Sequence, residues 1–146
     1  MKVFFLSLLI CFVYTYDTNK AISYARRYCR NYNPLYPNYC QFSDNAHFVS
    51  QCLVAGGQDL KGCSGVNNRG LIEYVPNLEN CLINKGWKKS VGMTKDFKAG
   101  YPFFIHNQHA MIATSVSGNF LYYCAHTTDR CDSGMQARSN FIYYYL

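Results

Sequence analysis

The sequence predicts an α+β domain in which helices fill the first half of the chain and an antiparallel sheet fills the second. Between residues 18 and 86, apolar residues recur at steps of three and four, and the runs end at glycine or proline, as in amphipathic helices. From residue 101 onward, short runs of β-branched and aromatic residues alternate with turn residues, as in strands. Helices followed by strands in one chain are typical of the α+β class.

The first helix is expected to begin at Thr18, whose hydroxyl can cap it, and to stop at Asn33-Pro34. Pro34 and Pro37 then favour an extended loop, because proline disfavours helical backbone at the residue before it. The apolar face of this helix comprises Ala21, Ile22, Ala25, Tyr28, Cys29 and Tyr32.

The second helix is expected to begin at Ser43 or Asp44, either of which can cap it, and to end at Gly56-Gly57. Residues 57–75 are rich in glycine and asparagine and predict a surface loop. Pro76 can open a third helix that closes at Gly86. Four strands are then expected, at residues 101–105, 110–116, 120–125 and 141–146, with a hairpin turn at 117–119.

The first residues of the chain have the form of a secretory signal peptide, predicted here as residues 1–15. Met1-Lys2 is a short positive start, and residues 3–13 are almost entirely apolar. A membrane anchor is the rival interpretation, but this run is well short of the roughly 20 apolar residues that a spanning helix needs. The 146-residue chain is therefore expected to give one secreted domain, residues 16–146, in the secretory pathway or outside the cell, with no membrane span.

Composition argues against several ligand classes. The net charge of +6 falls to +5 when Lys2 is removed, and the densest basic cluster, Lys85, Lys88 and Lys89, is typical of a solvated turn. We therefore expect no nucleic-acid partner. No CxxC pair occurs and the histidines lack zinc-finger spacing, so neither a metal nor another cofactor is expected. The sequence indicates no oligomeric state.

Seven of the eight cysteines remain after loss of Cys11 with the signal peptide, and an odd number leaves at least one thiol without a partner in the same chain. Cys52 lies on the apolar stripe of the second helix and is expected to be that thiol, buried as a small hydrophobe. Six cysteines allow fifteen pairings. Short loops favour the bridges Cys29–Cys40, Cys63–Cys81 and Cys124–Cys131.

The start of the second helix is where a nucleophile would be placed. A helix N-terminus lowers a thiol pKa, and a neighbouring base with an orienting polar residue completes such a site. Asn45 occupies this position. His109 opens a strand and is expected to face that helix end, while His126, at the end of the next strand, or Asp129 is the candidate orienting residue.

These residues resemble the putative amidase domain family, which is related in architecture to papain-like and NlpC/P60-type cysteine peptidases. The family's Asp-Cys-Thr/Ala-Asn-Phe-Val-Ser-Gln run corresponds to residues 44–51, and its Ala-Gly-Gly to residues 55–57. Its His-Ala-x-Ile-x-Thr and His-Thr-x-Asp-Arg elements correspond to residues 109–114 and 126–130. The resemblance covers about residues 18–131. Weaker matches are residues 22–28, 33–36 and 100–103.

The resemblance implies that His109 is the base, that His126 or a neighbour supports it, and that the substrate is a peptide-type amide. It also places Asp44, His47 and Asp129 at the substrate. The chain departs from the family at three positions, because the cysteine falls on Asn45, an asparagine on His47 and a strand-leading aspartate on Tyr101.

The loss of the family cysteine argues against nucleophilic catalysis. Asn45 has no removable proton on its oxygen and a delocalised lone pair on its nitrogen. Cys52 lies about two helical turns, roughly 10 Å, further along the axis. Cys40 lies in the preceding loop and would have to leave its proposed bridge to Cys29. Rescue by either thiol is therefore not expected.

The leading hypothesis is a secreted, catalytically inactive amidase-like domain whose cleft binds a peptide or peptidoglycan-type amide near Asn45, His109 and His126. One alternative is an active hydrolase, with another nucleophile or a water activated by His109 while Asn45 polarises the carbonyl. The other is a disulfide-bonded structural or interaction protein whose cleft is filled, for example by residues 57–75.

Overall fold

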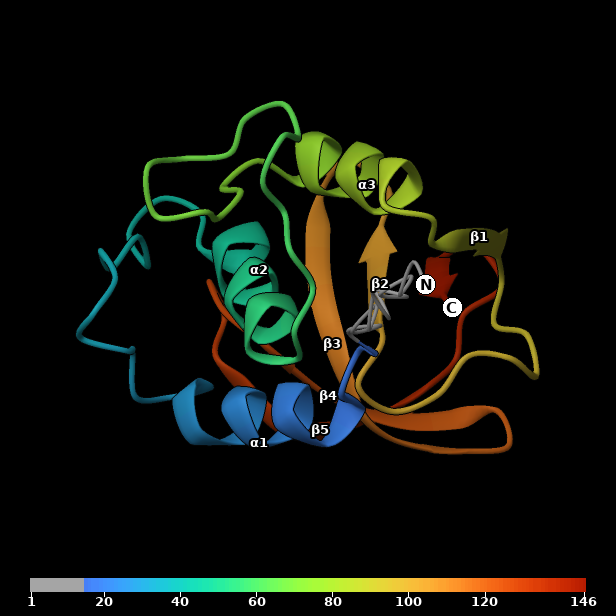
Figure 1. Cartoon of the computed structure of the whole chain (residues 1–146). Helices are drawn as coiled ribbons and strands as arrows, with labels where there is room; N and C mark the ends of the chain where they lie inside the picture. The colour runs from blue at the N-terminus through green and yellow to red at the C-terminus, as the bar shows by residue number, and fades with distance from the viewer. Residues whose placement is uncertain (1–14) are drawn as a thin grey trace, which may run out of the picture.

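The computed structural model describes residues 15–146 (Figure 1). Residues 1–14, with Cys11 and nearly all of the predicted signal peptide, lie outside the described residues. Within the described range, no helix is long and apolar enough to cross a membrane. The helices are α1 (Thr18–Tyr28), α2 (Asn45–Ala55) and α3 (Val75–Asn84). The strands are β1 (Lys88–Val91), β2 (Pro102–Ile105), β3 (His109–Ser117), β4 (Phe120–Ala125), β5 (Arg130–Gln136) and β6 (Ile142–Tyr145).

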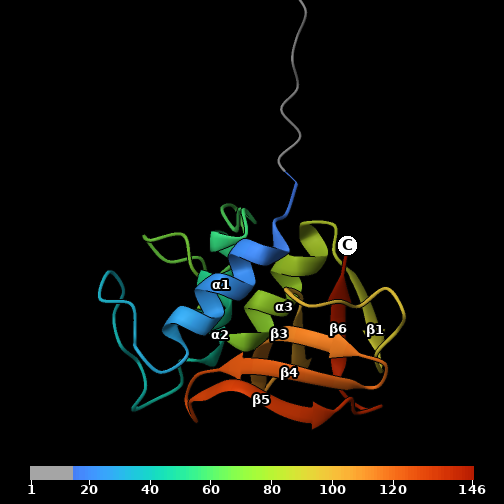
Figure 2. The same cartoon turned by 90° about the horizontal axis from the view of Figure 1, so that it is seen from below.

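The six strands form one sheet in the order β1-β6-β2-β3-β4-β5, and every neighbouring pair is antiparallel. This confirms the α+β class. Helices α1 and α2 pack against each other and against β3 and β4, while α3 packs against α2. The sheet is strongly curved, because β3, β4 and β5 run across the direction of β6 and β1 in Figure 2.

The strand order brings two turns to one edge of the sheet. In an antiparallel meander, alternate connections lie at the same end, so the β2–β3 turn (residues 106–108) and the β4–β5 turn (residues 126–129) are neighbours. The first turn of α2 meets both. The Ala110 amide donates to Asn45 Oδ1 (3.2 Å), and the Asp44 amide donates to Thr127 Oγ1 (2.9 Å). This junction holds the candidate site.

The helix ends differ in part from the sequence prediction. Asp17 rather than Thr18 caps α1, because its carboxylate accepts from the Lys20 amide (3.0 Å). The same helix ends at Tyr28, before Asn33-Pro34, where the chain turns to bring Cys29 to Cys131. Asp44 precedes α2 as predicted but makes no side-chain capping bond, since its carboxylate is used elsewhere.

Two strands were not predicted. The ranges of β2, β3, β4 and β6 agree with prediction to within one residue at each end. In contrast, β1 is short and lysine-rich, and β5 (Arg-Cys-Asp-Ser-Gly-Met-Gln) lacks β-branched and aromatic residues. Each forms because a neighbouring strand of high β propensity offers an unpaired edge. β1 pairs with β6, and β5 pairs with β4. Tertiary pairing overrides weak propensity in both.

The core is rich in aromatic side chains on both faces of β6. Tyr143 stacks on Phe103 (5.6 Å between ring centroids) and meets Phe97 edge to face (5.0 Å). Its neighbour Tyr144 points to the opposite face, where it meets Phe104 (5.2 Å). The segment 57–75 is a loop as predicted, but it also contributes buried apolar side chains, namely Leu60, Leu71 and Ile72.

The disulfides correct two of the three predicted bridges. The structure pairs Cys29 with Cys131 and Cys63 with Cys81, each with 5.4 Å between Cα atoms. The Cys63–Cys81 bridge agrees with prediction, whereas Cys29–Cys40 and Cys124–Cys131 are wrong. The reason is that α1 packs against β5, so that Cys29 lies beside a cysteine that is 102 residues away in the sequence.

Three of the described cysteines are free. Cys52 is buried on α2, as predicted. Cys124 is also buried, and its Sγ accepts from the Asp132 amide (3.5 Å). Cys40 is exposed in the segment that joins α1 to α2, which we call the strap (residues 30–43).

The Cys29–Cys131 bridge is expected to stabilise the fold more than Cys63–Cys81, because it closes a loop of 102 residues rather than 18. The chain-entropy model gives about 4.7 kcal/mol for a loop of about 100 residues and about 3 kcal/mol for one of about 15. Guanidinium unfolding of the Cys29→Ala/Cys131→Ala and Cys63→Ala/Cys81→Ala proteins tests this ranking. A Cys29–Cys40 peptide in a non-reducing digest of the native protein would contradict the pairing.

Candidate active site

Asn45, the first residue of α2, faces His109, the first residue of β3. Asn45 Nδ2 lies 3.3 Å from His109 Nδ1 and also donates to Ser43 Oγ (3.3 Å). The amide oxygen accepts from the Ala110 backbone, which fixes the orientation of the side chain, because an N–H group requires an acceptor. The predicted meeting of Asn45 and His109 is therefore present in the structure.

The orientation of Asn45 determines the tautomer of His109. Because Asn45 Nδ2 is a donor, His109 Nδ1 accepts, and the neutral ring carries its proton on Nε2. Nε2 has no hydrogen-bond partner among residues 15–146, and the side chain is exposed. His109 thus presents Nδ1 to position 45 and Nε2 to the solvent.

A cavity of about 210 Å³ opens between the β2–β3 and β4–β5 turns. Asn45, which is 1% exposed, lies at its base, and no residue of the 57–75 loop lines it. Position 45 is therefore not covered by that loop. The lining residues are Asn45, Ile105, His109, Ala110, Met111, Tyr123, Ala125, His126, Thr128 and Arg130.

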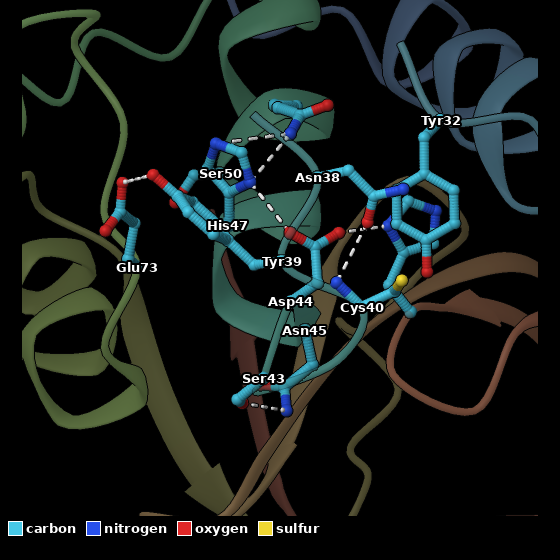
Figure 3. Close-up of polar contacts among 12 residues, drawn as sticks. Tyr32, Asn38, Tyr39, Cys40, Ser43, Asp44, Asn45, His47, Ser50 and Glu73 are labelled. Carbon is cyan, nitrogen blue, oxygen red and sulfur yellow. Dashed lines mark hydrogen bonds and ion pairs between the residues drawn. The ribbon is translucent and has the colours of Figure 1, made fainter. Parts of the chain in front are cut away.

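Asp44 does not line this cavity but lies in a buried cluster with two histidines, of which His47 is labelled in Figure 3. Its two carboxylate oxygens contact His47 Nδ1 (2.9 Å) and His126 Nδ1 (2.5 Å). Asp44 and His47 are 1% and 0% exposed. Both were expected at the substrate, but neither residue lines this cavity.

His126 supports Asp44 rather than His109. Its second ring nitrogen, Nε2, donates to the Tyr28 carbonyl (2.7 Å), so both nitrogens have partners other than the predicted one. The carboxylate and the carbonyl are both hydrogen-bond acceptors, so the two ring nitrogens are engaged from opposite sides. The pair is a buried, charge-assisted hydrogen bond between His126 and Asp44. The predicted role of His126 as orienter of the base is not supported.

The Asp44 cluster lies in an aromatic enclosure. The His126 ring is stacked between Phe48 (3.8 Å) and Tyr32 (4.1 Å). Asp129, the alternative orienting residue, is exposed and accepts from the Tyr32 hydroxyl (2.8 Å), so it holds the strap rather than the base or a substrate. On the other side, Tyr39 of the strap packs against His47 (4.9 Å).

Two opposing effects act on the pKa of Asp44. Burial alone would raise it, because a charge is poorly solvated in the interior, but the hydrogen bonds and positive charge supplied by His126 and His47 lower the pKa below its ordinary value of 3.8. Asp44 therefore remains a carboxylate at neutral pH.

No described thiol lines the cavity. Cys52 is wholly buried, and burial raises the pKa of its thiol well above the ordinary value. Burial also raises the pKa of Cys124, which packs in the core. Cys40 lies in the strap and does not line the cavity. The geometry places the His109 ring opposite the N-terminus of α2, with the Asn45 amide between them.

Comparison with known proteins identifies the family of the chain. Residues 15–145 match the family model described as "Putative amidase domain", and the chain belongs to this family. A segment of 50 residues is 44% identical to the uncharacterized protein YhbB of Bacillus subtilis (strain 168). This segment makes up 34% of this chain and 15% of the length of YhbB. No solved structure matches the chain.

Arg130, Thr128 and Tyr32 are the residues that sequence reasoning missed. Arg130 and Thr128 belong to the motif at residues 126–130, but their position at the cavity depends on strand β5, which was not predicted. Recognition of strands on both sides of this motif would have placed Thr128 and Arg130 at the turn between them.

Substitution Asp44→Asn is expected to destabilise the protein at neutral pH by about 1–3 kcal/mol, because it leaves two buried histidines without their charged partner. The folded pKa lies below the unfolded value of 3.8, so the unfolded chain binds the proton more readily. The stabilisation is thus complete above about pH 4 and is lost as the pH falls through the folded pKa. Urea unfolding at pH 7 and pH 3 should show the difference between the two proteins shrinking in acid.

The matched control is Asp129→Asn, an exposed carboxylate one residue before β5. It is expected to change the free energy of unfolding by about 1 kcal/mol or less at pH 7. Equal effects of the two substitutions at pH 7 would show that the Asp44 cluster contributes no more than a surface contact.

Proposed function

We propose that the chain is a secreted amidase-like domain, related in architecture to papain-like and NlpC/P60-type hydrolases, that binds a peptide or peptidoglycan-type amide without cleaving it through residue 45. The observation that carries this proposal is the contact between Asn45 and His109 at the base of an open cavity. In this proposal, position 45 corresponds to the nucleophile position of the family and carries an amide, which cannot attack.

The hydrogen bonds of Asn45 support inactivity. Its amide nitrogen is shared between Ser43 and His109, and its oxygen accepts from Ala110. The side chain therefore joins the start of α2 to the start of β3 and has little freedom to approach a substrate. An amide also lacks the activated proton and lone pair that covalent catalysis requires.

The remaining cavity has the character of a binding site. Ile105, Met111 and Tyr123 provide an apolar wall, while His109 and Thr128 provide polar groups. Apolar walls with a few convergent polar groups are typical of small-ligand sites. His109 Nε2 can donate to a carbonyl oxygen of a bound amide, because it carries the proton of the neutral ring.

Secretion is supported by the disulfides. Bridges such as Cys29–Cys131 persist in oxidising compartments and are rare in the cytosol. Together with the N-terminal apolar run, they favour an extracellular or secretory-lumen location.

Hydrolysis by water is the second candidate, and the open Nε2 of His109 favours it. In the tautomer described here, however, Nε2 holds a proton and Nδ1 accepts from Asn45. The neutral ring then has no free lone pair with which to deprotonate water. Binding without turnover is therefore the better-supported function.

Isothermal titration with muropeptides and with short protein-derived peptides is expected to detect binding by the wild-type protein to at least one class. His109→Ala should weaken that binding about tenfold, the value of one well-placed hydrogen bond. The control is His106→Gln, in the β2–β3 turn just before His109, which is bonded to Glu79 (2.9 Å) and lies outside the cavity lining. Mass spectrometry of the titrated samples should show uncleaved ligand. Binding to neither class, or release of a product, would contradict the proposal.

Asn45→Cys is expected to create a reactive thiolate, because the new thiol would lie at a helix N-terminus beside His109 Nδ1. The measurement is the alkylation rate with iodoacetamide, in a Cys40→Ser background that removes the exposed thiol. Between pH 8.5 and pH 6 the rate of an ordinary thiol falls about a hundredfold, while that of a thiol with a depressed pKa falls less than about fivefold.

Addition of His109→Ala to the Asn45→Cys protein serves as the control and should restore the steep pH dependence. If the thiol at position 45 behaves as an ordinary thiol while His109 is present, the machinery around the ancestral nucleophile is no longer intact.

A further inference from the structure

The cavity contains a positive charge that no described residue neutralises. Arg130 lines the cavity and makes no side-chain hydrogen bond or ion pair with any residue from 15 to 146. The acidic groups around it are engaged elsewhere. Asp44 is held by two buried histidines, Asp129 accepts from a tyrosine, and Asp132 pairs with Arg26 (3.0 Å). None of these carboxylates lines the cavity.

Arg130 is exposed and lies in a paired strand at the cavity edge. It is the first residue of β5, and its backbone pairs with Ala125 at the end of β4. The neighbouring turn carries Thr128, which also lines the cavity and whose hydroxyl can act as a second donor. The cavity therefore has a cationic, hydrogen-bond-donating side in addition to its apolar wall.

A guanidinium group matches a carboxylate in shape as well as in charge. Its planar N–H groups can form two parallel hydrogen bonds to the two carboxylate oxygens. A single arginine neutralises one negative charge, which suits a carboxylate better than a doubly charged phosphate. The low polarity of the apolar wall strengthens such a contact.

We propose that the cavity recognises a carboxylate group of its amide ligand, with Arg130 as the main contact and Thr128 as a second donor. This inference rests on the proposed function, and it narrows the ligand to acidic peptides. The carboxylate can come from an acidic side chain or α-carboxyl within the peptide, or from a free C-terminus.

The test uses two peptide series, N-acetyl-Ala-Glu-Ala and the stem peptide L-Ala-γ-D-Glu-L-Lys-D-Ala. Each is prepared in four forms, with the glutamate carboxylate free or amidated and with the C-terminus free or amidated. Isothermal titration with the wild-type protein should show that one of the two carboxylates strengthens binding about tenfold or more, the value of a charge-assisted hydrogen bond. The form that loses affinity on amidation identifies the source of the carboxylate.

Three variants separate recognition from general electrostatics. Arg130→Met should remove the preference for the carboxylate form, and Arg130→Lys should keep part of it, since charge remains but the two-pronged geometry is lost. Arg138→Met removes the same charge from an exposed site outside the cavity and should leave the preference unchanged. Circular dichroism establishes that each variant is folded.

The outcomes are distinguishable. If both series bind but amidation has no effect in either, or if Arg130→Met weakens all four forms equally, carboxylate recognition is wrong and the binding function stands. If none of the eight peptides binds the wild-type protein, the proposed function itself fails, and the inference fails with it.

Discussion

The site depends on one buried carboxylate. Asp44 is held between His47, which belongs to α2, and His126, which follows β4. His126 also bonds to the Tyr28 carbonyl at the end of α1. The cluster therefore joins three parts of the chain. Asn45 is the next residue, so its direction toward His109 follows from the direction in which Asp44 is held. A buried charge that loses a partner is strongly destabilising, which gives the fold a single arrangement at this junction.

Much of the fold follows from local pattern. The apolar stripe from Phe48 to Leu53 and the glycines at 56–57 define α2, and the alternating or continuous apolar runs define β2, β3, β4 and β6. The contact between Asn45 and His109 was also predictable. Each residue begins an element that matches a family motif, and the order of the elements places the start of α2 opposite the start of β3. These features depend on residues that are near one another in the sequence or on the order of elements.

The features that sequence reasoning missed depend on contacts between distant segments. Cys29 is close to Cys40 in the sequence but lies beside Cys131 only because α1 crosses β5. His47 is a polar residue in the first turn of α2. Its burial depends on the carboxylate of Asp44 and on the tyrosines of the strap. β5 has no strand propensity of its own and forms only beside β4. In each of these cases the partner that stabilises the residue cannot be read from its own neighbourhood.

The position of the Cys29–Cys131 bridge has a consequence for proteolytic processing. The strap, residues 30–43, begins directly after Cys29 and carries exposed Leu35 and Phe42, so it is a natural place for cleavage. A cut there separates α1 from the rest of the backbone, yet the disulfide keeps the two fragments in one covalent molecule. The nicked protein would keep nearly the mass of the intact protein under oxidising conditions. The fragment that carries the first helix would be released only when the disulfide is reduced.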